Sequence, residues 1–143
     1  MLRVEPELKA AYVANGTVSL SFVHVLDHGE ASHVAHRAAE CAGSQSPLAF
    51  WQMHDLLFAR QAQIWNATPD VLVGWAEELN LDGAAMASCL ADPAIAEKVE
   101  RIDQARRTAG IRLRPSFTLN DTLIEGALPF AGFVQRLAEQ GIN

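Results

Sequence analysis

Residues 50–58 read Phe-Trp-Gln-Met-His-Asp-Leu-Leu-Phe, and this stretch decides the fold. Its apolar positions 50, 53, 57 and 58 recur with the 3.6-residue period of an amphipathic helix. Trp51 and Leu56 add large apolar side chains on the flanks of that stripe. The pattern predicts an almost wholly buried helix that begins near Pro47.

Four more helices are predicted around this one, which makes residues 29–110 a continuous helical region. The first of them runs from about residue 30 to 42, and Gly43 is expected to close it. The others begin at N-cap residues, two of them followed by a proline at the first helical position. These start signals are Thr68-Pro69, Asp82 and Asp92-Pro93.

Outside the helical region the pattern changes to β-type. Residues 17–26 alternate with period two, with Val18, Leu20 and Phe22 on one face, before Val23 and Val25 make the other face apolar as well, which predicts a mostly buried strand. Residues 116–119 and 122–125 are two short β-type runs around Asn120-Asp121, which predicts a hairpin. With helices over residues 2–14 and 129–140 at the two ends, the order is that of one α/β domain spanning residues 1–143.

Composition narrows the class of protein. The chain has 143 residues, of which 50% are hydrophobic and 20% charged, and its net charge is −6. These values exclude a disordered chain, and the acidic balance argues against nucleic acid or an anionic membrane as partner. The charged N-terminus has no signal-peptide pattern, and no apolar run reaches the roughly 20 residues of a membrane span. As written the chain is expected in the cytoplasm; export stays open if the true N-terminus lies upstream.

Four stretches together resemble the DsbA-like branch of the thioredoxin-fold disulfide oxidoreductases, across essentially the whole chain. The resemblance implies a thioredoxin-like sheet with a large helical insert, at about residues 29–110. It also implies a first strand and a CxxC motif, which this sequence lacks, because Met1 falls inside the helix that follows them. The matching stretches are residues 38–42, 50–58, 110–117 and 125–130.

The two cysteines do not replace the missing motif. A reactive thiolate is stabilised at a helix N-terminus, whereas Cys41 is predicted near a helix C-terminus and Cys89 stands beside Leu90 in a short helix. We therefore expect no catalytic residue in this chain and no oxidoreductase activity as written. The alternative function is a non-catalytic module that binds a protein or itself.

The resemblance also points to a substrate loop at Arg114, Pro115 and Ser116, where the family has a cis-proline that faces an extended peptide. The residues alone would favour a trans bond, with Pro115 merely starting an edge strand. Leu113 and Arg114 replace the glycine and threonine that are usual in the family. A bulky, charged loop of this kind would alter the groove for a protein or peptide substrate.

Cys41 and Cys89 lie on neighbouring predicted helices, and some family members have a second, structural cysteine pair in this region. A disulfide between them is one alternative. Two buried reduced thiols are the other, and we favour it because nothing in the sequence indicates an oxidising compartment.

The histidines do not support a metal site, and no cofactor is expected. His33 and His36 share a helix face, and His24 and His28 precede them, but the spacing of zinc ligand pairs is absent. His54 lies within the apolar run and is interpreted as a hydrogen-bonded core histidine.

Five arginines between residues 101 and 114 are interpreted as a solvated face; the alternative is a surface for an acidic partner or for self-association. The absent first strand would leave two strand edges unpaired. We therefore expect a homodimer formed by strand or N-terminal helix exchange, or else a sheet in which the two flanking strands pair with each other.

Overall fold

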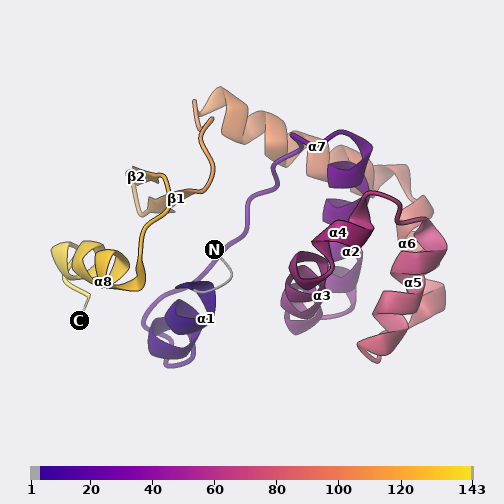
Figure 1. Ribbon diagram of the computed structural model, residues 1–143, viewed down its shortest axis with the longest axis horizontal. Helices are drawn as coiled ribbons and strands as arrows, with labels where there is room; N and C mark the ends of the chain where they lie inside the picture. The colour runs from indigo at the N-terminus through magenta and orange to yellow at the C-terminus, as the bar shows by residue number, and fades with distance from the viewer. Residues whose placement is uncertain (1–3, 143) are drawn as a thin grey trace. The chain divides into compact units, whose positions relative to one another are not determined.

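The computed structural model describes residues 4–142 and contains eight α-helices, one π-helical turn and two strands within that range (Figure 1). The chain divides into two compact units. One, the helical unit, comprises residues 23–106, and the other, the hairpin unit, comprises the described residues before 23 and after 106. The bounds of the helical unit lie close to those predicted for the insert, at about 29–110.

The helical unit is built from six helices, most of which begin where the sequence places a cap. Side-chain oxygens of Ser46, Thr68 and Asp82 each accept a hydrogen bond from a backbone N–H in the first turn of the helix that follows. The last helix, α7, extends two residues beyond the unit. The helices are α2 (Glu30–Gln45), α3 (Pro47–Ala59), α4 (Gln61–Ile64), α5 (Pro69–Glu78), α6 (Gly83–Ala91) and α7 (Pro93–Thr108).

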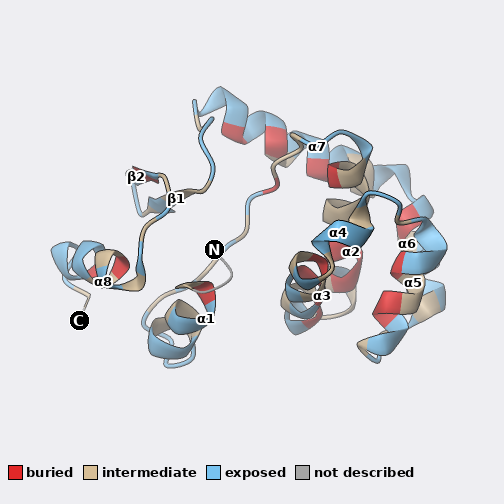
Figure 2. Cartoon of the chain, in the orientation of Figure 1, coloured by how far each residue is buried: buried red, intermediate tan, exposed pale blue. Residues whose placement is uncertain are grey.

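One apolar cluster forms the core of the helical unit, between α2, α3, α5 and α6 (Figure 2). Met53, Leu72 and Met86 are fully buried in it, and Trp75 is nearly so. Burial of each such side chain contributes about 1.5–3 kcal/mol to folding. The prediction that α3 is almost wholly buried is wrong, because Leu48 is 67% exposed and only one face of the helix meets the core.

Gly43 does not end α2, contrary to the sequence prediction, and the helix continues to Gln45. A Cβ atom at position 43 would lie 3.2 Å from Cβ of Phe50. The glycine therefore permits a close approach between α2 and α3 rather than providing a left-handed stop.

A buried ionic cluster joins the extended segment before α2 to α7. Asp103 accepts hydrogen bonds from the Leu26 amide at 3.1 Å and from Arg106 Nη2 at 2.6 Å, and Arg106 Nη2 also donates to Asp27 at 3.2 Å. Asp103 and Arg106 are each 6% exposed. The interpretation of all five arginines as a solvated face is thus wrong for Arg106, whose charge is buried and paired.

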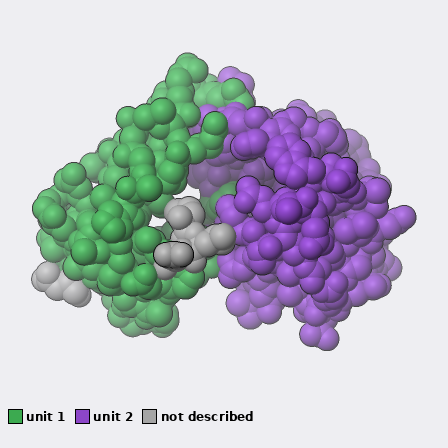
Figure 3. All heavy atoms as spheres, viewed as in Figure 1, with its two compact units in different colours: residues 1–22, 107–143 green, residues 23–106 purple. Residues whose placement is uncertain are grey.

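The hairpin unit, green in Figure 3, contains short elements from the two ends of the chain. Its strands pair antiparallel from Ser116 opposite Glu125 to Leu119 opposite Thr122, as the sequence predicts. Asn120 takes the left-handed backbone conformation that the tight turn requires, with φ of 51°. The elements are α1 (Val4–Leu8), the π-helical turn η1 (Lys9–Val13), β1 (Ser116–Leu119), β2 (Thr122–Glu125) and α8 (Phe130–Glu139).

Few apolar side chains are buried in the described part of the hairpin unit. The Phe117 ring meets the Phe133 ring edge to face at 4.7 Å, and Tyr12 lies against Phe130 at 6.5 Å between ring centres. Phe133 is 8% exposed. The helix predicted over residues 129–140 is confirmed as α8, which buries Phe133 and Leu137 on one face.

The strand predicted over residues 17–26 does not form. Residues 18–22 keep the alternation of half-buried and exposed side chains, but within residues 4–142 the sheet contains only β1 and β2. Val23, predicted to be buried, is 49% exposed, and His24 is buried instead. A β-type sequence needs a neighbour for its backbone hydrogen bonds, and this segment has no strand neighbour in the described range. The expected pairing of the two flanking strands with each other is likewise wrong.

The architecture is α/β and mostly helical, with a large helical insert in the sequence between the elements of the hairpin unit. Among the helices of residues 4–142, none combines the length and the apolarity needed to cross a bilayer.

Candidate functional site

The loop before β1 carries the three residues predicted to face a substrate. The Arg114–Pro115 peptide bond is cis. The Pro115 carbonyl accepts a hydrogen bond from the Gly126 amide at 2.9 Å, and Ser116 Oγ donates to the Leu113 carbonyl at 2.6 Å. These two bonds fix the loop onto the start of the hairpin.

The side chains of this loop differ in exposure. Leu113 is 58% exposed and Arg114 is exposed, whereas Pro115 and Ser116 are half-buried. The departure from small residues seen in the sequence thus places an apolar group and a cation at the surface. Strand β1, which follows, pairs with β2 and with no other strand of residues 4–142.

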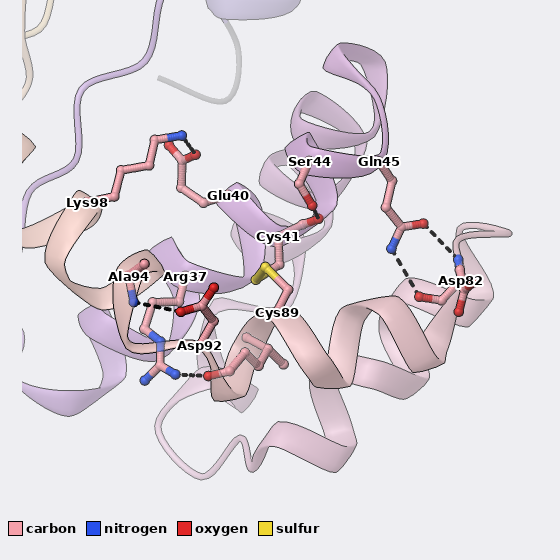
Figure 4. The surroundings of a disulfide bond; sticks show 11 residues. Arg37, Glu40, Cys41, Ser44, Gln45, Asp82, Cys89, Asp92, Ala94 and Lys98 are labelled. Atoms are coloured by element: carbon pink, nitrogen blue, oxygen red, sulfur yellow. Dashed lines mark hydrogen bonds and ion pairs between the residues drawn. A yellow bond between two sulfur atoms is a disulfide. The ribbon is translucent and has the colours of Figure 1, made fainter.

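Cys41 of α2 and Cys89 of α6 form a disulfide, with their Cα atoms 5.6 Å apart (Figure 4). The preference for two reduced thiols is therefore wrong, and the alternative that the sequence left open is the one observed. Sequence separation hid this proximity, because the two residues are 48 positions apart and three helices lie between them.

Polar contacts on both sides of the disulfide join α2 to α6 and to Asp82, the N-cap residue of α6. Arg37 donates to the Leu90 carbonyl, and the Gln45 side chain exchanges two hydrogen bonds with the Asp82 backbone, at 2.8 and 3.0 Å (Figure 4). Cys41 is fully buried. The covalent bond is thus embedded in a contact that α2 and α6 make along much of their length.

Neither cysteine has the surroundings of a catalytic thiol. Cys41 lies in the last third of α2 and Cys89 in the last third of α6, far from the N-terminal turns where a thiolate would be stabilised. Because the two sulfur atoms are bonded to each other, neither is available as a nucleophile in this state.

A second polar centre, which the sequence did not predict, lies beside α2. His24 Nδ1 is 3.0 Å from His36 Nδ1, and His24 Nε2 is 2.6 Å from Glu40 Oε1. His36 Nε2 is 3.0 Å from the Val25 carbonyl oxygen, and the Lys98 ammonium contacts the second oxygen of Glu40. We call these residues, His24, His36, Glu40 and Lys98, the histidine pair cluster.

The protein environment lowers two pKa values in this cluster. Burial lowers the pKa of His36 to about 4, and the charge of His24 acts in the same direction. The hydrogen bond from His24 lowers the pKa of Glu40 to about 2, with a further contribution from Lys98 that overcomes the opposing effect of burial. At neutral pH His36 is therefore neutral and Glu40 ionised.

The other histidines have separate partners. His33 lies 3.9 Å from a carboxylate oxygen of Glu100, and the His28 ring meets Trp65 edge on. His54 is 4% exposed, and its Nδ1 lies 2.9 Å from Asp55 Oδ1. The interpretation of His54 as a hydrogen-bonded core residue is confirmed.

One sequence signal could have found the histidine pair cluster. His36 and Glu40 stand four positions apart, so they share a face of α2, and the sequence neighbours of Glu40, Ala39 and Cys41, are small apolar residues. A charged residue among small apolar ones on a buried helix face needs a partner. The sequence interpretation paired His36 with His33 instead and overlooked Glu40.

Comparison with known proteins places the chain. A family model described as thioredoxin matches residues 2–139. Disulfide bond formation protein D of Bacillus subtilis is 28% identical over 124 residues, which cover 84% of this chain and 55% of that protein. Na(+)/H(+) antiporter NhaA 1 of Salinispora arenicola is 37% identical over 89 residues, which cover 62% of this chain and 13% of the antiporter. The chain therefore spans about half the length of the first relative and a small part of the second.

The fold agrees with a solved structure. The crystal structure of oxidised BdbD from Bacillus subtilis aligns with a TM-score of 0.82 at 24% identity, and the alignment covers 94% of this chain and 75% of that one. From the family model and these relatives, the chain belongs to the thioredoxin family, among its DsbA-like thioredoxin-fold members.

Proposed function

We propose that this chain is a peptide-binding module of the DsbA-like disulfide oxidoreductase family that performs no dithiol exchange by itself. The observation that carries the proposal is the position of its two cysteines, bonded to each other between α2 and α6. Exchange requires a thiolate that attacks a disulfide and a second thiol that resolves the mixed disulfide. The chain has no further cysteine to supply either group.

The binding half of the proposal rests on the loop and on β1. An extended peptide can add to a strand that has a neighbour on one side only, and its backbone then supplies most of the hydrogen bonds. The Arg114 guanidinium, at the surface beside β1, favours an acidic residue in such a peptide. The bulk of Leu113 works against a peptide that would need to approach the loop backbone closely.

The claim that the chain performs no dithiol exchange is tested with an insulin-reduction assay and with oxidation of a dithiol peptide, using the oxidised chain. We expect no rate above the uncatalysed reaction, and Cys41→Ser should leave that rate unchanged. Turnover by the native chain that Cys41→Ser abolishes would contradict the proposal.

The binding half needs a separate measurement. An extended acidic peptide without cysteine, titrated by calorimetry, should bind the native chain and bind the Arg114→Glu variant at least about tenfold more weakly. Arg101→Glu, an equal charge reversal at an exposed position of α7, is the matched control and should keep the native affinity. Equal affinity of all three proteins would contradict a role for the loop.

A second candidate function is self-association. The sheet has two strands within the described residues, and residues 18–22 alternate in exposure without pairing to it. Such edges recruit another strand, and a second copy of the chain can supply one. Light scattering at micromolar concentration should then give the mass of a dimer. A mass of one chain over that concentration range would rule this candidate out.

A further inference from the structure

The histidine pair cluster contains an arrangement of hydrogen bonds whose protons can be counted. The contacts of the four ring nitrogens include one with a carbonyl, one with a carboxylate, and one between the rings. Each contact needs one hydrogen between its two heavy atoms. The count fixes the charge of the pair.

The contact with Val25 fixes the first proton. A carbonyl oxygen only accepts hydrogen bonds, so at 3.0 Å from it His36 Nε2 must carry a hydrogen. The contact with Glu40 fixes the second. An ionised carboxylate also only accepts, so His24 Nε2, 2.6 Å away, must donate.

The third proton lies between the two rings. The Nδ1 atoms of His24 and His36 are 3.0 Å apart, a hydrogen-bonding distance that two lone pairs facing each other would not keep. One of the two nitrogens therefore carries a hydrogen. Three protons on two imidazole rings are one more than two neutral rings hold, so the pair is a cation.

The neighbouring groups decide which ring is charged. Glu40, whose pKa is held near 2, lies against His24, whereas His36 faces a neutral carbonyl and has its own pKa lowered to about 4. His54 also disfavours charge on His36, and Asp103, which favours it, is already bound to Arg106. The Lys98 ammonium on the far oxygen of Glu40 keeps that carboxylate ionised, so the proton does not move onto it.

We infer that the fully buried side chain of His24 is an imidazolium at neutral pH, held between the Glu40 carboxylate and the Nδ1 lone pair of neutral His36. This proton fastens the extended segment that carries His24 and Val25 to α2. When the proton leaves, two neutral rings have two hydrogens for three contacts, and one of the contacts becomes repulsive. The cluster is thus a pH-dependent clamp inside the helical unit.

The inference is tested by long-range ¹H–¹⁵N NMR of the histidine rings in the oxidised, full chain at pH 7. Both nitrogens of His24 should show the signals of protonated nitrogens. His36 should show a protonated Nε2 and a bare Nδ1. A bare nitrogen on His24, or a doubly protonated His36, would overturn the inference with no variant needed.

Two variants test whether the Glu40 carboxylate is what keeps His24 protonated. Glu40→Gln replaces the carboxylate by an amide that can donate, so His24 should become neutral at pH 7 and its Nε2 bare. Glu100→Gln is the matched control, because it makes the same change at an exposed carboxylate of α7 that lies near His33 and outside the cluster, and His24 should keep both protons. An unchanged His24 spectrum in a folded Glu40→Gln variant would contradict the inference.

The same spectra distinguish a metal ion from a proton between the rings. A metal bound by both Nδ1 atoms would leave neither of them protonated, and elemental analysis would find it in stoichiometric amount. That result would overturn the inference. Spectra that do not change on treatment with a chelator, with no stoichiometric metal, are the expected result.

Discussion

The helical unit and the hairpin unit are stabilised in different ways. The helical unit has a continuous apolar core, a disulfide and two buried polar clusters. The described part of the hairpin unit buries few apolar side chains, chiefly Ile124, Phe133 and Leu137, around a sheet of two strands. A two-stranded hairpin is marginally stable by itself.

The difference teaches that the insert, although it interrupts the thioredoxin-like elements in the sequence, contains most of the stabilising interactions of the chain. Local opening follows burial and contact, so amide protons of α2 and α3 should exchange more slowly than those of β1 and β2. Each prediction below changes one unit and uses the other, or a neighbouring position, as its reference.

The largest effect is expected from the core of the helical unit. Leu57→Ala should lower the free energy of unfolding by about 2–5 kcal/mol, since it removes a side chain that is 6% exposed and leaves a cavity. Leu113→Ala, the same change at a side chain 58% exposed in the hairpin unit, should cost less than about 0.5 kcal/mol. Urea denaturation measures the free energy of unfolding of both variants. Equal losses would contradict the assignment of Leu57 to the core.

Removal of the disulfide should have the next largest effect. The double variant Cys41→Ala, Cys89→Ala should lose about 2–4 kcal/mol, because the bond closes a long loop in the unfolded chain. Thermal denaturation followed by circular dichroism gives the value. A loss of less than about 1 kcal/mol would contradict a stabilising role for the bond.

The histidine pair cluster should make stability depend on pH. The pKa of folded His36 is depressed to about 4, so the stability present above the ordinary value of 6.5 is lost as pH falls toward 4. Glu40, with its pKa lowered to about 2, extends the loss below pH 4.5. Between pH 6.5 and 4 the loss should be about 1–3 kcal/mol.

Denaturation curves at several pH values test this dependence. His36→Asn should flatten the profile between pH 4 and 6.5. His33→Asn, at the half-buried histidine near Glu100, should leave it unchanged and serves as the control. A native profile that is already flat in this range would contradict the depressed pKa of His36.

The smallest expected effect compares one residue type in both units. Asn80 after α5 and Asn120 in the hairpin turn have φ angles of 60° and 51°. A valine at either position should cost about 1–2 kcal/mol, because a branched side chain disfavours the left-handed conformation. Hydrogen exchange should show the loss over α5 and α6 for Asn80→Val and over β1 and β2 for Asn120→Val. Loss over the whole chain from either variant would mean that the two units unfold together.

Local signals in the sequence predicted much of this fold. Thr68, Asp82 and the Asn120 turn act through groups a few residues away, and the structure agrees at all three positions. The prediction of a strand over residues 17–26 was wrong, because a strand depends on a neighbouring strand that its own sequence does not contain. The prediction that Gly43 ends its helix was wrong, because the role of this glycine depends on Phe50 of the next helix, which packs close to it.

The candidate sites were harder to predict, because they depend on residues far apart in the sequence. The Cys41–Cys89 bond and the contact between His24 and Glu40 both require the arrangement of helices to be known. The cis-proline loop at Arg114–Pro115 was selected as a candidate only through resemblance to a family. Composition and periodicity alone give no reason to select Arg114–Pro115 over another proline.

The disulfide also affects how the chain can be pulled apart. The bond encloses α3, α4 and α5 in a covalent ring, so a motor that threads the polypeptide from one end reaches a branch point at Cys41 or Cys89. Beyond that point two segments of the polypeptide must pass through the motor side by side, or the disulfide must first be reduced. A ring-shaped unfolding protease that admits a single extended chain would therefore stop there, and the oxidised protein would be processed to a fragment that contains the ring.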